Sequence, residues 1–178
     1  LDAKIGDKRW VFTTPVEPNR LTAPAVAGDT VYVVGQHPSQ SPTVWALATL
    51  DGSVRWREEL GGETAGPPVV TDGHLYCVTT NDGLYAVDTA EEGVAWQQSL
   101  TPSVGPPAAT ADGVFVGTRD GVVCYDSDGS RRWRVAATTA LTRPHDGPVL
   151  DETRLYTAGP DGNSVVALEA ETGEEQWR

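Results

Sequence analysis

The chain has no methionine, only two cysteines and two lysines, and no run of 18 apolar residues. The missing apolar run excludes a membrane-spanning helix from this segment, whereas a signal peptide or lipid anchor ahead of Leu1 is left open. No window has sustained helical periodicity, so we expect almost no helix. Because Cys77 and Cys124 match no metal-binding spacing, we predict that both are buried thiols, in strands of different sheets.

Basic residues are also scarce, since 13 of them stand against 25 acidic residues and the net charge is −12. We expect no nucleic-acid partner, because no basic stripe exists to neutralise phosphates. An acidic surface with so little lysine stays hydrated where salt screens charge. The composition resembles that of halophilic archaeal proteins and favours an extracellular or cell-surface location. An ordinary acidic domain and a cytoplasmic location are the alternatives.

What the chain does contain is a repeated phrase that ends in tryptophan. The final copy, ALEAETGEEQW, matches ALATLDGSVRW, AVDTAEEGVAW and CYDSDGSRRW earlier in the chain, and the opening LDAKIGDKRW is a further copy. The tryptophans are Trp10, Trp56, Trp96, Trp133 and Trp177, so the period is about 40 residues. Because this tryptophan recurs in every unit, we predict that it packs the repeat together and binds no ligand.

Each period contains four short runs rich in Val, Leu, Tyr and Thr. In the copy that begins at Gly66 the runs are PPVVT, HLYCVTT, LYAVDT and VAWQQSL, separated by Asp-Gly or a similar acidic turn. Asp-Gly between such runs is a strong hairpin signal, because the turn needs positive φ. Each period therefore predicts a four-stranded antiparallel sheet. One such sheet cannot bury its own faces, so neighbouring sheets must stack as the blades of a β-propeller.

The predicted fold is thus all-β, with blades at 21–60, 61–100, 101–136 and 137–178. Residues 1–14 are predicted to be the outer strand of a preceding blade.

The repeat carries a family resemblance. The motif A-x-[D/E]-x-x-T-G-x-x-x-W, complete in Ala167, Glu169, Thr172, Gly173 and Trp177, resembles the tryptophan-docking motif of the PQQ-like (pyrroloquinoline-quinone-like) propeller repeat. The other copies are degenerate; in the second, for example, a glutamate stands at the glycine position. The resemblance covers all 178 residues and implies a closed ring of about eight blades. Four blades would then be part of a larger ring, completed by missing blades of the same chain or by a second copy.

The resemblance is specific for fold and weak for function, since the repeat serves both enzymes and non-enzymatic scaffolds. Our main hypothesis is a non-catalytic scaffold or binding module, with no catalytic residues, no metal and no cofactor. The alternative is a fragment of a quinoprotein alcohol or sugar dehydrogenase, for which the resemblance implies PQQ and calcium. The adjacent cysteines of many such dehydrogenases are missing here. A third reading, the outer-membrane barrel-assembly lipoprotein of similar fold, fits the repeat but not the salt-adapted composition.

A partner of this scaffold, whether a protein or a small molecule, is expected at one rim of the propeller. The loops between blades and those between second and third strands gather there, and the irregular ones interrupt the repeat. These loops supply the candidate ligand-binding residues Arg20, His37, Asn81, Arg119, Arg143 and His145. Asp126 and Asp128 resemble part of a calcium loop, but they occupy the ordinary turn of the repeat, so we predict a structural turn.

Overall fold

The computed structural model describes residues 5–14, 20–37, 40–100, 105–136, 147–151, 153–159 and 163–178. These residues contain strands and turns but no helix. The all-β prediction is confirmed. Its physical basis is the strand-turn alternation of each period, in which β-branched and aromatic side chains lie between glycine-containing turns.

The strands form four antiparallel sheets, each arranged in chain order. The first sheet contains β1 (Arg20–Leu21), β2 (Ala25–Ala27), β3 (Thr30–His37), β4 (Gln40–Ala48) and β5 (Val54–Glu59). The second contains β6 (Val69–Thr71), β7 (His74–Thr79), β8 (Gly83–Asp88) and β9 (Gly93–Gln98). The third contains β10 (Ala108–Thr110), β11 (Gly113–Thr118), β12 (Gly121–Tyr125) and β13 (Arg131–Ala136). The fourth contains β14 (Val149–Leu150), β15 (Arg154–Ala158), β16 (Val165–Glu169) and β17 (Glu175–Trp177).

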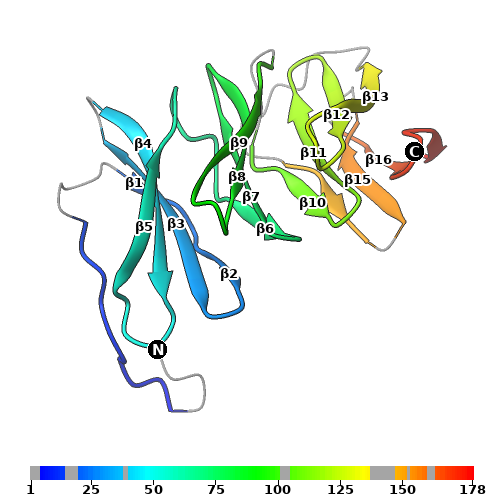
Figure 1. The fold of residues 1–178 in the computed structure, drawn as a ribbon. Helices are drawn as coiled ribbons and strands as arrows, with labels where there is room; N and C mark the ends of the chain where they lie inside the picture. The colour runs from blue at the N-terminus through cyan, green and yellow to red at the C-terminus, as the bar shows by residue number, and fades with distance from the viewer. Residues whose placement is uncertain are drawn as a thin grey trace.

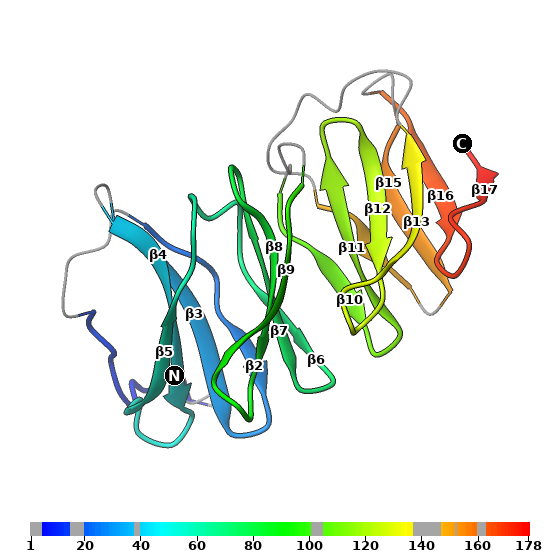
Figure 2. The same ribbon diagram turned by 45° about the horizontal axis from the view of Figure 1, so that its top comes forward.

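The four sheets lie side by side as blades of a β-propeller arc, from the first in blue and cyan to the fourth in orange and red (Figures 1 and 2). The first sheet has a fifth, two-residue strand because its inner strand is interrupted. Both β1 and β2 pair with the same edge of β3, and the side-chain Oγ1 of Thr22 between them accepts a 3.2 Å hydrogen bond from Val34 N.

The hydrophobic core lies between neighbouring sheets. Trp56 of the first sheet packs in one cluster with Leu75 and Val87 of the second. Phe115 of the third sheet packs with Leu155 of the fourth in the same way, and a further cluster joins the second and third sheets. The two middle strands of each blade carry most of this core, because each of them faces a neighbouring blade on at least one side.

The repeated tryptophan contacts an aromatic ring of its own blade. Trp56, Trp96, Trp133 and Trp177 lie on the fourth strands, and their partners on the second strands are Tyr32, Tyr76, Phe115 and Tyr156. The four pairs have almost the same geometry, with centroid separations of 5.8–5.9 Å and tilts of 47–50°. Such tilted pairs are a favoured aromatic arrangement.

The same indole also reaches the next blade. Trp96 donates a hydrogen bond of 2.7 Å to the carbonyl of Ser127, and Trp133 donates one of 3.0 Å to Ala170. The rings lie flat against the turn glycines Gly129 and Gly173, where an added Cβ would come within 2.8 Å of the indole. Trp96 and Trp133 therefore each link their own sheet to the turn between the third and fourth strands of the following one.

Residues 5–14 differ from the prediction of an outer strand. They adopt no strand, and the described residues include no other strand of a preceding blade with which they could pair. Trp10 nevertheless docks as the other copies do, against Gly52 and with a 2.9 Å hydrogen bond from Nε1 to the Thr49 carbonyl. Phe12 adds a ring contact at 5.9 Å to Trp45 on the outer side of the first blade. The segment thereby covers this side of the first blade.

The strand turns fall into two sets at opposite ends of the blades. We call the end with the second-to-third strand turns and the blade connections the rim face. We call the opposite end the acidic face, because its first-to-second and third-to-fourth strand turns carry Asp29, Asp51, Asp72, Glu91, Glu92, Asp112, Asp126, Asp128, Asp151, Glu171 and Glu174. Tight turns with positive φ favour aspartate before glycine, and Asp51, Asp72, Asp112 and Asp128 occupy such positions at this end, as Asp82 and Asp120 do at the rim.

Candidate functional site

The rim face holds the four predicted site residues that the structure describes. Arg20 is exposed in β1 and pairs with Gln36 of β3, which places it beside His37 at the end of that strand. Asn81 is exposed in the β7–β8 turn and Arg119 in the β11–β12 turn. These residues come from three successive blades, so they form a broad surface and no single pocket. The predicted residues Arg143 and His145 lie outside the described residues.

A hydrogen-bonded cluster that the sequence did not reveal fixes the rim of the second blade. The Tyr85 hydroxyl donates to the Asp82 carboxylate and accepts hydrogen bonds of 3.0 Å from both Gly61 N and Gln97 Nε2. Burial, followed by the bond to Asp82, raises the pKa of Tyr85 to about 12. The phenol therefore stays neutral and ties the connection between the first two blades to the β7–β8 turn.

A glutamine makes the corresponding link in the first blade. Gln36 accepts a 3.0 Å hydrogen bond from Thr64 N through Oε1, and it donates through Nε2 to the carbonyls of His37 and Gln40. These bonds hold the β3–β4 hairpin against the connection to the second blade. The described part of the rim is thus a surface whose turns are held by polar contacts, with cationic, amide and acidic side chains exposed on it, the acidic ones including Glu63 and Asp120.

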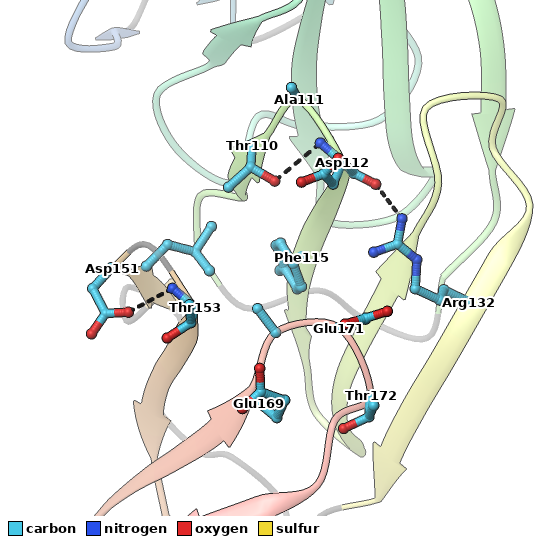
Figure 3. Close-up of a pocket in the computed structure, with 12 residues that line it drawn as sticks. Thr110, Ala111, Asp112, Phe115, Arg132, Asp151, Thr153, Glu169, Glu171 and Thr172 are labelled. Atoms are coloured by element: carbon cyan, nitrogen blue, oxygen red, sulfur yellow. Dashed lines mark hydrogen bonds between the residues drawn. The ribbon is translucent and has the colours of Figure 1, made fainter.

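The acidic face contains a cavity of about 920 Å³ between the third and fourth blades. Figure 3 shows the Phe115 ring at its centre, with Asp112 and Arg132 on one side, Asp151 and Thr153 on another, and Glu169, Glu171 and Thr172 along a third. Phe115 lies on β11, Arg132 on the outer strand β13 and Glu169 at the end of β16, and the other groups come from the turns that follow β10, β14 and β16. No sequence motif marks this cavity, because its residues come from separate turns of two different repeats.

The charges around the cavity differ in how they are compensated. Arg132 donates from Nε to Asp126 at 2.7 Å and also donates to the Asp112 carbonyl, so its charge is neutralised inside its own blade. Asp151 accepts hydrogen bonds from Tyr156 Oη at 2.6 Å and from two backbone N–H groups. The bond from Tyr156 is the main reason that the pKa of Asp151 lies below its usual range.

Within the described ranges, no group of three or more His, Cys, Asp or Glu side chains could hold a metal ion. Asp126 and Asp128 accept hydrogen bonds from Ser130 and so serve the turn itself. Cys77 and Cys124 are buried free thiols in β7 and β12, as predicted, and burial raises both pKa values to about 12. In the part of the chain that is described, no helix is long and apolar enough to cross a membrane.

The four sheets and the docked tryptophans define a β-propeller made of PQQ-like repeats. The chain belongs to the PQQ_2 family, whose model is described as outer membrane protein assembly factor BamB and matches residues 1–103 and 84–178. The curated relatives agree with this assignment. The chain is 27% identical to the assembly factor BamB of Yersinia pestis over its full length, covering 50% of that protein, and 29% identical to that of Moranella endobia, covering 51%. It therefore spans about half the length of these relatives.

Solved structures of this fold include proteins of different function. BamB from Moraxella catarrhalis has a TM-score of 0.71 at 17% identity, over 88% of this chain and 51% of that one. The quinohemoprotein alcohol dehydrogenase ADHIIG from Pseudomonas putida has a TM-score of 0.72 at 17% identity, over 95% of this chain and 35% of that one. The computationally designed Ika4 protein has a TM-score of 0.70 at 12% identity, over 93% of this chain and 99% of that one.

Our reason for setting the outer-membrane assembly family aside was wrong. The acidic, lysine-poor composition argued against it, yet the family model and the curated relatives all point to it. Surface charge is a poor guide to membership of a repeat family, because the repeat is defined by its buried and turn positions. The relatives named above are bacterial, so they give no support to a halophilic archaeal source.

Proposed function

We propose that the chain is a non-catalytic scaffold that binds a partner protein on its rim face. The observation that carries this proposal is the match to the assembly-factor family along the whole chain. The relatives are named as factors in outer membrane protein assembly, and this chain corresponds to about half of such a protein. Its part in that work would be to present a rigid surface and to do no chemistry.

The architecture of the rim supports a binding surface. The bonds from Tyr85 and Gln36 hold its turns and connections in place, so little ordering would be needed when a partner docks. Exposed Arg20, Asn81 and Arg119 supply charged and hydrogen-bonding groups across three blades. A surface of this breadth suits a protein partner better than a small molecule, which requires a concave pocket.

The second part of the proposal concerns the environment in which the protein works. We infer from the composition a salt-rich extracellular or cell-surface environment, since 25 acidic residues stand against two lysines and eleven arginines. No cofactor is part of the proposal.

The specific observation that favours the dehydrogenase alternative is the fold shared with a quinohemoprotein alcohol dehydrogenase. A direct test is titration of the protein in molar KCl with PQQ and Ca²⁺ by calorimetry. Turnover would be followed by reduction of an artificial electron acceptor on a panel of alcohols and aldose sugars. We expect neither micromolar binding nor dye reduction. Calcium-dependent dye reduction would replace the scaffold with the dehydrogenase.

Partner binding is tested by photo-crosslinking. Benzoylphenylalanine would replace Asn81 or Arg119 on the rim face, and Val94 on the exposed outer strand β9 would be the matched control position. Crosslinking in the cells that make the protein should give an adduct of one defined mass from both rim positions and none from Val94. Equal labelling from all three positions, or none from the rim of natively folded variants, would contradict the proposed rim surface.

A further inference from the structure

We propose that the cavity between the third and fourth blades on the acidic face binds an arginine or lysine side chain of a partner protein segment. This site is separate from the rim face and does not depend on the rim being a binding surface. It is defined by Phe115 and Leu150 beneath a border of carboxylates.

The first argument is the charge that is left without compensation. Four carboxylates line the cavity, those of Asp112, Asp151, Glu169 and Glu171, against one guanidinium. That guanidinium, of Arg132, is already paired with Asp126. In the described part of the chain, no donor is hydrogen-bonded to the side-chain carboxylates of Asp112, Glu169 or Glu171. Arg154, which pairs with Glu169 across β15 and β16, is a second cation beside these carboxylates, so four carboxylates stand against two cationic side chains. A cation entering the cavity would thus meet an excess of negative charge, which favours electrostatic complementarity.

The second argument is the apolar base. Phe115 is 1% exposed and lies at the centre of the cavity, and its ring contacts Trp133 at 5.8 Å (Figure 3). Leu150 of the two-residue inner strand β14 lines the same space. Arginine and lysine have aliphatic stems that pack on apolar surface while the charged end stays at a polar border. Because Phe115 is itself almost fully buried, the apolar surface open to such a stem is that of the partly buried Leu150, with the carboxylates around it.

The third argument separates a side chain from a metal ion. The carboxylates come from the β10–β11, β14–β15 and β16–β17 turns and from the end of β16, and among the described residues they form no group that could hold a metal ion. A divalent cation needs several oxygens around one point. A guanidinium or an ammonium group on a peptide can instead contact carboxylates one at a time. The spacing therefore favours a basic peptide segment as the occupant.

The test uses two fluorescein-labelled probe peptides in which two leucines and two charged residues are set among glycines, with arginine in one peptide and glutamate in the other. Binding would be measured by fluorescence polarisation at the lowest KCl concentration at which the near-ultraviolet circular dichroism is native. We expect the arginine peptide to bind and the glutamate peptide not to bind. Chemical-shift changes in the ¹⁵N spectrum should gather at residues 110–112 and 169–172.

The variants are matched by charge and by turn. Glu169→Gln with Glu171→Gln removes two carboxylates from the cavity, and Glu91→Gln with Glu92→Gln removes two from the equivalent turn of the second blade. We expect the first pair to weaken binding of the arginine peptide about three- to tenfold and the second to leave it within twofold, since exposed ion pairs contribute modestly. Equal losses in both variants would show diffuse attraction to the acidic face and overturn the site. Binding of both peptides, or shifts centred on the rim, would also overturn it.

Discussion

Residue by residue, the degenerate copies of the repeat show which positions the fold requires. The turn before the fourth strand needs a residue with positive φ beneath the docked indole, and glycine meets this need at Gly129 with φ of 85° and at Gly173 with φ of 76°. In the second blade Glu92 occupies the position with φ of 62°. A side chain with a Cβ is disfavoured in this region, so the second blade contains a strained residue where the others contain glycine.

Replacing Glu92 with glycine should therefore stabilise the protein. We expect a gain of about 0.5–1 kcal/mol, because relief of the left-handed conformation outweighs the greater freedom of glycine in the unfolded chain. Urea denaturation in molar KCl measures it. The control is Gly129→Ala, which should destabilise, since its Cβ would lie 2.8 Å from Trp96. A lower urea midpoint for Glu92→Gly would show that the strain is compensated by contacts of the glutamate.

The dependence of folding stability on acid pH can also be traced to single turn residues. Asp51 accepts hydrogen bonds from Ser53 N at 3.0 Å and from Ser53 Oγ at 2.7 Å, and the backbone bond is the main reason that its pKa is lowered. Asp128 is bonded to Ser130 in the same way, with a lowered pKa. Because the folded pKa lies below the unfolded one, both groups contribute stability above about pH 4 that is lost as pH falls through the folded pKa.

We accordingly expect the double variant Asp51→Asn with Asp128→Asn to lose less stability than the parent between pH 5 and pH 3. Asparagine keeps an accepting oxygen in the turn but does not titrate. Urea midpoints at the two pH values, taken at constant high salt, give the comparison. Parallel losses in the two proteins would mean that other carboxylates determine the acid sensitivity.

At the scale of elements, the fourth strand of each blade joins one sheet to the next. Trp96 makes a ring contact with Tyr76 of its own blade at 5.9 Å and with Tyr125 of the next at 6.4 Å. Its indole N–H is bonded to Ser127 in the same following blade. Trp177 also contacts Tyr156 in its own blade, but its side chain remains 49% exposed. A comparison of Trp96 with Trp177 therefore distinguishes the effect of packing within a blade from the effect of docking between blades.

Trp96→Ala should cost about 3 kcal/mol, the lower end of the range for deleting a buried aromatic side chain, because the indole is partly buried and also docks on the next blade. Trp177→Ala should cost clearly less, about 1–2 kcal/mol, because only the contact within the blade is lost. Denaturation midpoints in high salt compare the two variants. An unchanged midpoint for Trp96→Ala would show that the indole does not hold neighbouring blades together, and equal costs would show that docking adds nothing to the ring pair.

For the whole molecule, charge is the dominant global property. A net charge of −12 on 18.9 kDa repels itself when it is unscreened, and the acidic face concentrates this charge at one end of the blades. Surface pairs such as Arg55 with Asp29, at 2.5 Å, offset little of this repulsion because they are exposed.

We therefore expect the protein to be more stable and less expanded in molar KCl than in dilute buffer. Thermal unfolding and small-angle scattering at the two ionic strengths measure both properties. Potassium chloride is compared with sodium chloride to separate screening, which the two salts share, from effects of one cation. A higher unfolding temperature in dilute buffer would contradict the salt-adapted setting that we propose.

The candidate sites differ in how far the sequence could predict them. The placement of Asn81 and Arg119 in rim turns follows from the sequence alone, because each comes after a second strand whose end the repeat defines, whereas their role in binding stays a prediction. The cavity was missed, since Asp112 and Glu171 are ordinary turn residues in their own repeats and gain a possible role only when two blades stand together. The Tyr85 cluster was missed for a similar reason, because Gly61 reaches it from the preceding blade connection.

The sequence by itself determined the all-β class, the four-stranded sheets and their turns. These features depend on local patterns, namely short β-prone runs and Asp-Gly turns, which act within a few residues and recur in every copy. Only the tertiary structure decided how Trp133 meets Ala170 and which carboxylates surround Phe115. Those relations depend on the spacing of two sheets whose contacting residues are about 40 positions apart in the chain. This spacing results from the packing of side chains between neighbouring blades. The sequence of a single repeat contains no information about that packing.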